Sequence, residues 1–117
     1  GGAWSLQRIV GQSKALELIW TGEIFGAEEA LEMGYLSRVV PHDQLLDETY
    51  ALARRIADGP PVAVQLAKRL VHRAATQSFV ESLESAQAAM TVVQSTEDAK
   101  EGPLAFVEKR KPNFQGR

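Results

Sequence analysis

Apolar residues recur at spacings of three and four through most of the second half of the chain, which predicts amphipathic helices. The first such helix follows Pro41, has apolar positions from Leu45 to Ala57 with Asp43 elsewhere on the helix, and ends near Asp58-Gly59. A second helix is expected to start at Pro60-Pro61, because a missing N–H costs nothing in the first helical turn. Its buried stripe is expected to be Val62, Leu66, Leu70 and Ala74.

A third helix follows in which the apolar positions alternate in steps of four and three. This narrow stripe is typical of a helix that packs along a neighbouring helix. Beyond it, Ser95 and Asp98 resemble a capping box, and Gly102-Pro103 is expected to break the next helix and restart a short segment that ends before Pro112. The residues of the stripe are Phe79, Leu83, Ala86, Met90 and Val93.

The first third of the chain has weaker patterns. Ser13 is expected to cap a short helix that Gly22 ends, and a second short helix is expected over residues 27–33, ended by Gly34. Residues 35–40 have β-propensity and a weak alternation, which predicts one strand before Pro41. The residues therefore predict a mainly α fold class with one strand near the start.

Composition narrows the possible functions. The chain has 117 residues, 44% hydrophobic and 24% charged, which is typical of a single folded domain. A formal charge of −2 provides no global field for binding nucleic acid or an anionic membrane, so any basic site must be local. With no cysteine and two histidines, a metal site is not expected. No apolar run approaches the roughly 20 residues that cross a bilayer, so we expect a cytoplasmic protein.

No catalytic constellation is visible in the sequence. The serines lie in no nucleophile-elbow pattern, and His42 and His72 have no evident carboxylate partner. The cluster Lys109-Arg110-Lys111, with Arg117, has two interpretations that remain open. Its cations can satisfy helix carbonyls, or they can meet a phosphate.

Several phrases in order along the chain resemble the C-terminal portion of the crotonase superfamily, the enoyl-CoA hydratases and isomerases. The phrases are residues 1–11 (beginning Gly1-Gly2-Ala3-Trp4), 15–18 leading into Thr21-Gly22, 27–30, 34–41, Glu101-Gly102, Ala105-Phe106 and 108–114. The resemblance implies a spiral of ββα turns followed by a helical region that forms trimers, often paired into hexamers. Residues 1–41 would then be a remnant edge of the spiral core with one or two short strands, and residues 42–117 the helical oligomerisation region.

The family binds acyl-CoA thioesters and stabilises an enolate-like oxygen with two backbone N–H groups. Those donors and the catalytic acids precede the Gly-Gly segment in the family, so no catalytic residue is assigned here. The resemblance implies that Gly1 and Gly2 line the acyl pocket and that Lys109 approaches the CoA nucleotide. Met90 would lie near the adenine, although its place in the apolar stripe favours plain core packing.

The expected function is therefore that of a C-terminal piece of a crotonase-type enzyme, inactive by itself. Hydration of a 2-enoyl-CoA is the leading reaction, and double-bond isomerisation is the alternative. A non-catalytic helical oligomerisation module is the hypothesis from another class. The expected partners are an acyl-CoA substrate and further copies of the chain, with no nucleic acid, no membrane and no cofactor beyond the CoA thioester.

Overall fold

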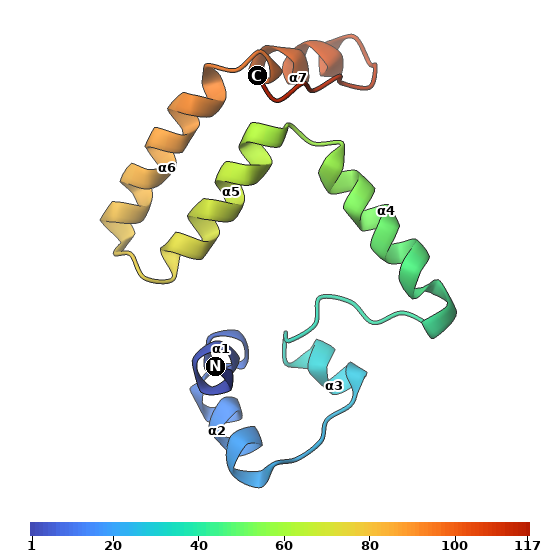
Figure 1. The fold of residues 1–117 in the computed structure, drawn as a ribbon, viewed down its shortest axis with the longest axis vertical. Helices are drawn as coiled ribbons and strands as arrows, with labels where there is room; N and C mark the ends of the chain where they lie inside the picture. The colour runs from blue at the N-terminus through green and yellow to red at the C-terminus, as the bar shows by residue number, and fades with distance from the viewer. The chain divides into compact units, whose positions relative to one another are not determined.

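A computed structural model describes all 117 residues and contains seven α-helices, one 3-10 turn and no β-strand. The mainly α fold class is confirmed. The chain divides into two units, Gly1–Glu48 and Thr49–Arg117, which are described separately. No helix is long and apolar enough to span a membrane. The helices are α1 (Gly2–Val10), α2 (Gln12–Thr21), α3 (Ala27–Glu32), α4 (Leu45–Ala57, preceded by the 3-10 turn His42–Gln44), α5 (Pro61–Ala74), α6 (Phe79–Gln94) and α7 (Asp98–Val107) (Figure 1).

The first unit begins with a helix that the sequence reading missed. α1 packs against α2, and its Leu6 and Val10 are half-buried at the i, i+4 spacing of one helical face. Gly11 joins the two helices with φ +82°, a backbone conformation that favours glycine. Gly11 is the N-cap of α2, so the prediction that Ser13 caps this helix is wrong.

The predicted strand over residues 35–40 is also wrong. Gly34 ends α3 with φ +74°, as expected, and the amides of Tyr35 and Leu36 both donate to the carbonyl of Ala30 at 2.8 and 3.0 Å. These amides therefore satisfy the end of a helix. No neighbouring strand is present to accept the ladder hydrogen bonds that a β-strand requires. β-propensity alone does not create a strand.

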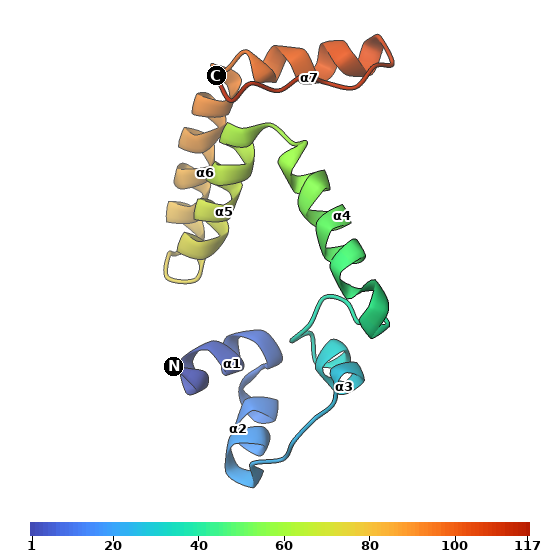
Figure 2. The same ribbon diagram turned by 45° about the vertical axis from the view of Figure 1, so that its right-hand side comes forward.

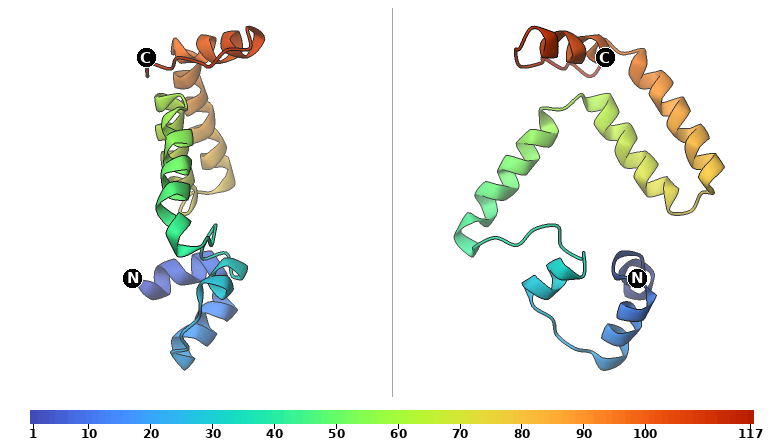
Figure 3. Two further views of the ribbon diagram at one scale, coloured as in Figure 1. Left: turned by 90° about the vertical axis from the view of Figure 1, so that its right-hand side faces the viewer. Right: turned by 180° about the vertical axis from the view of Figure 1, so that it is seen from behind.

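In the second unit, α5 and α6 form an antiparallel hairpin, visible from several directions in Figures 1, 2 and 3. Pro61 occupies the first position of α5, as predicted. Ser78 begins α6 with a complete capping box. Its Oγ accepts from the Glu81 amide at 3.3 Å, while its own amide donates to Glu81 Oε2 at 2.7 Å and lowers the pKa of Glu81.

The face of α6 that contacts α5 differs from the predicted apolar stripe. Phe79, Leu83 and Met90 are 77, 53 and 55% exposed. Short side chains replace them at the contact and allow the two helix axes to approach closely. The half-buried residues of α6 are Ser82, Ser85, Ala89 and Val93, of which only Val93 was predicted.

Two further predictions, both concerning α7, are wrong. The helix runs without interruption through Gly102-Pro103, where a break was expected. The Ser95–Asp98 capping box does not form, because Ser95 Oγ donates to the Val92 carbonyl at 2.7 Å. Thr96 takes the capping role instead, and its Oγ1 accepts from the Ala99 amide at 3.2 Å.

Candidate functional site

The residues after α7 form a tail, residues 108–117, that turns back and runs along the helix to its beginning (Figure 1). The main-chain oxygen of Arg117 accepts from the Glu97 amide at 2.6 Å. Helix α7 therefore begins and ends in contact with the same tail, and the ring of Phe114 lies over Gly102 between the two ends.

Asp98 holds the returning tail through its carboxylate. The residue is 5% exposed, and its Oδ1 and Oδ2 accept from the amides of Gln115 and Gly116 at 2.7 and 2.8 Å. Hydrogen bonds to an ionised group are about twice as strong as neutral ones. This buried carboxylate is therefore the main polar attachment of the tail, and this explains why Asp98 is not available to cap its own helix.

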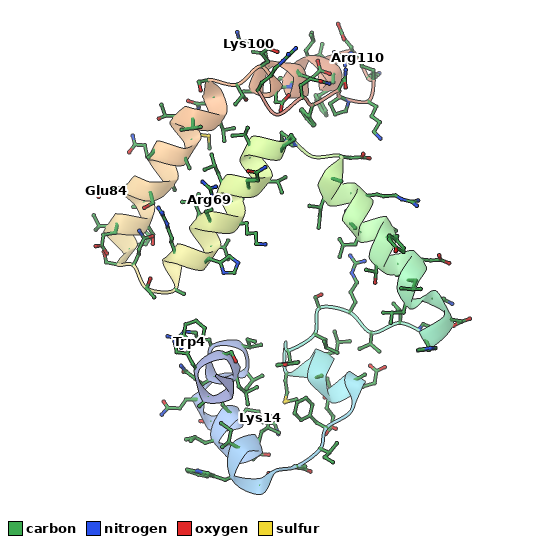
Figure 4. The ribbon with its side chains drawn as sticks, in the orientation of Figure 1. Trp4, Lys14, Arg69, Glu84, Lys100 and Arg110 are labelled. Atoms are coloured by element: carbon green, nitrogen blue, oxygen red, sulfur yellow. The ribbon has the colours of Figure 1, made fainter.

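Glu101 provides a second attachment one turn further along α7. Its carboxylate takes a bidentate contact from Arg110, with Nη1–Oε1 and Nη2–Oε2 distances of 2.5 and 2.8 Å, and it also accepts from the Asn113 amide at 2.7 Å. The Arg110 contact, with the Asn113 bond second, lowers the pKa of Glu101 to about 2. Glu108 also accepts from Arg110 Nε at 2.6 Å, and the two carboxylates raise the pKa of Arg110. Figure 4 shows Arg110 at the turn from α7 into the tail.

Lys109 occupies a special backbone position at this turn. Its φ is +54°, which makes it the only non-glycine residue of the chain in the left-handed region. Its amide donates to the Phe106 carbonyl at 3.3 Å and the next amide, of Arg110, donates to the Ala105 carbonyl at 3.0 Å. This is the hydrogen-bond pattern of a Schellman motif, in which glycine usually occupies this position. The helix carbonyls are therefore satisfied by main-chain amides.

The C-terminal cations divide into paired and unpaired groups. Arg110 binds Glu101 and Glu108, Lys111 Nζ lies 2.8 Å from Asp58 Oδ2, and Arg117 Nε lies 2.9 Å from Glu97 Oε2. The side chain of Lys109 makes no ion pair or hydrogen bond with the rest of the chain. Lys109 is therefore the one cation of this cluster whose charge is free to meet an external anion.

The other predicted substrate-binding residues lie at exposed positions. Met90 belongs to the exposed side of α6, so the alternative of core packing against α5 is not observed. Gly1 and Gly2 begin α1, and the Gly1 carbonyl accepts from the amides of Trp4 and Ser5, so the pair opens a helix. A Cβ built on either glycine would meet no atom within 4 Å, so within this chain neither glycine is required by close packing.

The structure shows no side-chain contact among these four residues. Met90 and Lys109 belong to the second unit, whereas Gly1 and Gly2 belong to the first, and their roles in binding stay predictions. No group of three or more histidine, aspartate or glutamate side chains could hold a metal ion. The tail attachments at Asp98 and Glu101 escaped the sequence reading. The available signal was two acids three residues apart on one helix, followed by a basic tail.

The family model described as enoyl-CoA hydratase/isomerase matches residues 1–117. The Mycobacterium tuberculosis protein named "Probable enoyl-CoA hydratase echA8" is 42% identical over 117 residues, which cover 100% of this chain and 46% of that protein. The 2,3-dehydroadipyl-CoA hydratase of Escherichia coli is 35% identical, with the same coverage of both chains.

Solved structures agree with this similarity. The crystal structure of an enoyl-CoA hydratase from Bacillus anthracis is 37% identical and superposes with a TM-score of 0.97, covering 100% of this chain and 45% of that one. An enoyl-CoA hydratase structure from Mycobacterium tuberculosis gives a TM-score of 0.93 at 32% identity, with 46% of that chain covered. The present chain spans about half the length of the curated relatives it matches.

Proposed function

We propose, since this chain belongs to the enoyl-CoA hydratase/isomerase family, that it is the helical, CoA-binding part of an enzyme that hydrates a 2-enoyl-CoA thioester. The names of the similar proteins support hydration over isomerisation. The observation that carries the proposal is the free charge of Lys109 at the end of α7. An unpaired ammonium at a rigid turn is a suitable partner for a phosphate of the CoA nucleotide.

The tail attachments support this role by reserving Lys109 for the ligand. Arg110 follows Lys109 directly, and its guanidinium occupies the carboxylates of Glu101 and Glu108. Glu108 directly precedes Lys109 in the sequence, and its carboxylate would be available to the Lys109 ammonium if Arg110 did not bind it. The left-handed backbone of Lys109 costs roughly 1–2 kcal/mol relative to the right-handed region. The hydrogen bonds of the tail offset this cost and hold the turn from which the Lys109 side chain extends.

In this proposal Met90 supplies apolar surface near the adenine, and Gly1 and Gly2 leave room for the acyl group. The thioester oxygen requires two amide donors, and the addition of water requires an acid and a base. The chain supplies no group to which we assign either role. We therefore expect no hydration of crotonyl-CoA by the 117-residue chain alone, and measurable turnover would contradict this part of the proposal.

Binding of CoA to the chain tests the role of Lys109. Lys109→Gln removes the free charge and should weaken binding about tenfold or more, because a hydrogen bond to a charged group contributes ~1.5–3 kcal/mol. Lys100→Gln is the matched control, since Lys100 is an exposed lysine of α7 that makes no ion pair (Figure 4). Isothermal titration calorimetry measures the affinity of each variant for CoA and for dephospho-CoA. Equal affinities for the two lysine variants would refute the assignment.

Self-association is the second part of the proposal, with a trimer or a pair of trimers as the expected assembly. The exposed apolar side chains of Phe79 and Leu83 on α6 support it, because bare apolar surface of this kind marks an interaction site. Sedimentation of the chain should show oligomers that Leu83→Glu dissociates. A monomer at high concentration would argue against self-association, and self-association without any CoA binding would favour the non-catalytic oligomerisation module.

A further inference from the structure

A second set of cations lies on α5, far along the chain from the C-terminal cluster. Lys68, Arg69, His72 and Arg73 form two adjacent i, i+4 rows, Lys68 with His72 and Arg69 with Arg73. Residues at this spacing are neighbours on a helix surface, with Cβ atoms about 5–6 Å apart. We call these four side chains the basic face of α5.

The basic face has no internal counter-charge. Residues 59–80 contain no aspartate or glutamate. None of the four side chains makes an ion pair or a hydrogen bond, and no ion pair joins Arg69 to Glu84 of α6 (Figure 4). This differs from the C-terminal cluster, where carboxylates neutralise all the cations except Lys109. A chain with a formal charge of −2 thus concentrates unpaired positive charge on two turns of one helix.

Helix stability does not account for this arrangement. His72 and Arg73 lie in the last turn of α5, where the helix dipole favours cations. Lys68 and Arg69 lie more than a turn earlier, where the dipole effect has faded. Like charges at i, i+4 destabilise a helix, and the Arg69–Arg73 row carries that cost. An external anion would turn the cost into a favourable interaction.

The shape of the surface fits a small anion. Together with Gln65, the four side chains line an open depression of about 440 Å³. Arginine presents a planar fork of N–H donors that binds a phosphate in a bidentate manner, and the two adjacent rows can each receive one phosphate. No aromatic side chain lines the depression, so it lacks the stacking platform that single-stranded nucleic acids use.

We propose that the basic face of α5 binds a diphosphate-bearing small molecule, with one phosphate on each row of cations. Gln65 adds an uncharged donor beside Arg69. This site is separate from the proposed CoA contact at Lys109, because it lies on a different helix and shares none of its residues. The two sources of the ligand chemistry are inorganic diphosphate and the diphosphate of a nucleotide.

NMR titration of the whole ¹⁵N-labelled chain tests the proposal, with inorganic pyrophosphate and ADP as separate probes at low ionic strength. Saturable shifts centred on residues 65–73 are expected. Pyrophosphate binding alone indicates the free anion, and tighter binding of ADP indicates a nucleotide. Arg69→Gln/Arg73→Gln should weaken binding about tenfold or more, since two charge-assisted contacts are lost. Lys109→Gln should leave these shifts unchanged even if CoA binding elsewhere is lost.

Arg54→Gln/Arg55→Gln on α4 is the matched control, because it removes the same charge from two exposed arginines that make no ion pair. It should change the affinity less than twofold. Equal weakening by both double variants would show a net-charge effect and overturn the proposal, as would the absence of saturable shifts with either probe. Saturation of the same residues only by duplex DNA or by anionic vesicles would also overturn it. Circular dichroism of each variant checks that the helices are retained.

Discussion

Replacing Asp98 by alanine should release the C-terminal tail from α7. The carboxylate accepts from two consecutive tail amides at 2.7 and 2.8 Å and is 5% exposed. Each hydrogen bond to an ionised group contributes about 1.5–3 kcal/mol when its partners are shielded from water. The tail amides can regain water once released, so we expect the loss to be about 2–4 kcal/mol, below the sum of the two bonds. Asp98→Asn keeps one acceptor oxygen and should lose about half as much.

Amide hydrogen exchange is the direct measurement, because the tail can open without global unfolding. Exchange at Gln115 and Gly116 should be roughly 30-fold faster or more in Asp98→Ala, since each 1.4 kcal/mol is a factor of ten. Asp58→Ala is the control within the same attachment. It removes a partner of Lys111 in an exposed ion pair, with side chains 57 and 74% accessible, and such pairs contribute about 0–1 kcal/mol.

Asp98→Ala is therefore expected to accelerate exchange in the tail more than Asp58→Ala does. If Asp58→Ala accelerated exchange at the tail as much as Asp98→Ala, the buried carboxylate would not be the main attachment. If Asp98→Ala left exchange unchanged, packing of Phe114 over Gly102 would be sufficient to hold the tail.

Three further predictions concern single contacts. The pKa of Glu101 is lowered from 4.5 to about 2. Its contribution to tail stability should therefore be complete above about pH 4.5 and lost as the pH falls toward 2, and protection of the Asn113 amide that stays constant from pH 5 to pH 2 would disprove this. Ser78→Ala should destabilise the second unit by about 1 kcal/mol in urea unfolding, through loss of the α6 cap, and a change below ~0.3 kcal/mol would contradict that role. Gly22→Ala should cost about 1 kcal/mol or more, because the residue has φ +64° at the end of α2, and a neutral effect on the melting temperature would show that this backbone relaxes.

Local signals in the sequence predicted much of the helical structure. The helix with apolar positions from Leu45 to Ala57 forms and ends as expected, because those positions keep helical spacing and Asp58-Gly59 interrupts it. Gly22 ends α2 in the left-handed conformation because glycine has no Cβ to clash there. Pro61 begins α5 because its missing N–H needs no partner in the first turn. Each of these features depends on residues close together in the chain.

Features that depend on distant residues were predicted less well. Periodicity correctly indicated that α6 packs along a neighbour, but it selected Phe79, Leu83 and Met90 for the contact instead of the small residues. Both faces of α6 repeat at helical spacing, so spacing cannot distinguish them. Packing against α5 selects the face with short side chains, because these let the two helices approach more closely than large side chains would. The strand over residues 35–40 failed for a similar reason, since a strand exists only where another strand accepts its hydrogen bonds.

The sequence by itself determined the family, the mainly α character and the candidate role of Lys109, because these follow from local propensities and from motifs read in order. Only the tertiary structure decided which cations remain free. Asp98 and Glu101 are separated from their tail partners by between 9 and 18 residues, and the return of the tail brings them together. That return pairs Arg110 with Glu101 of α7, and it leaves Lys109 as the unpaired cation of its cluster. Charge counted along a sequence records how many cations exist, whereas their availability depends on which carboxylates the fold brings within reach.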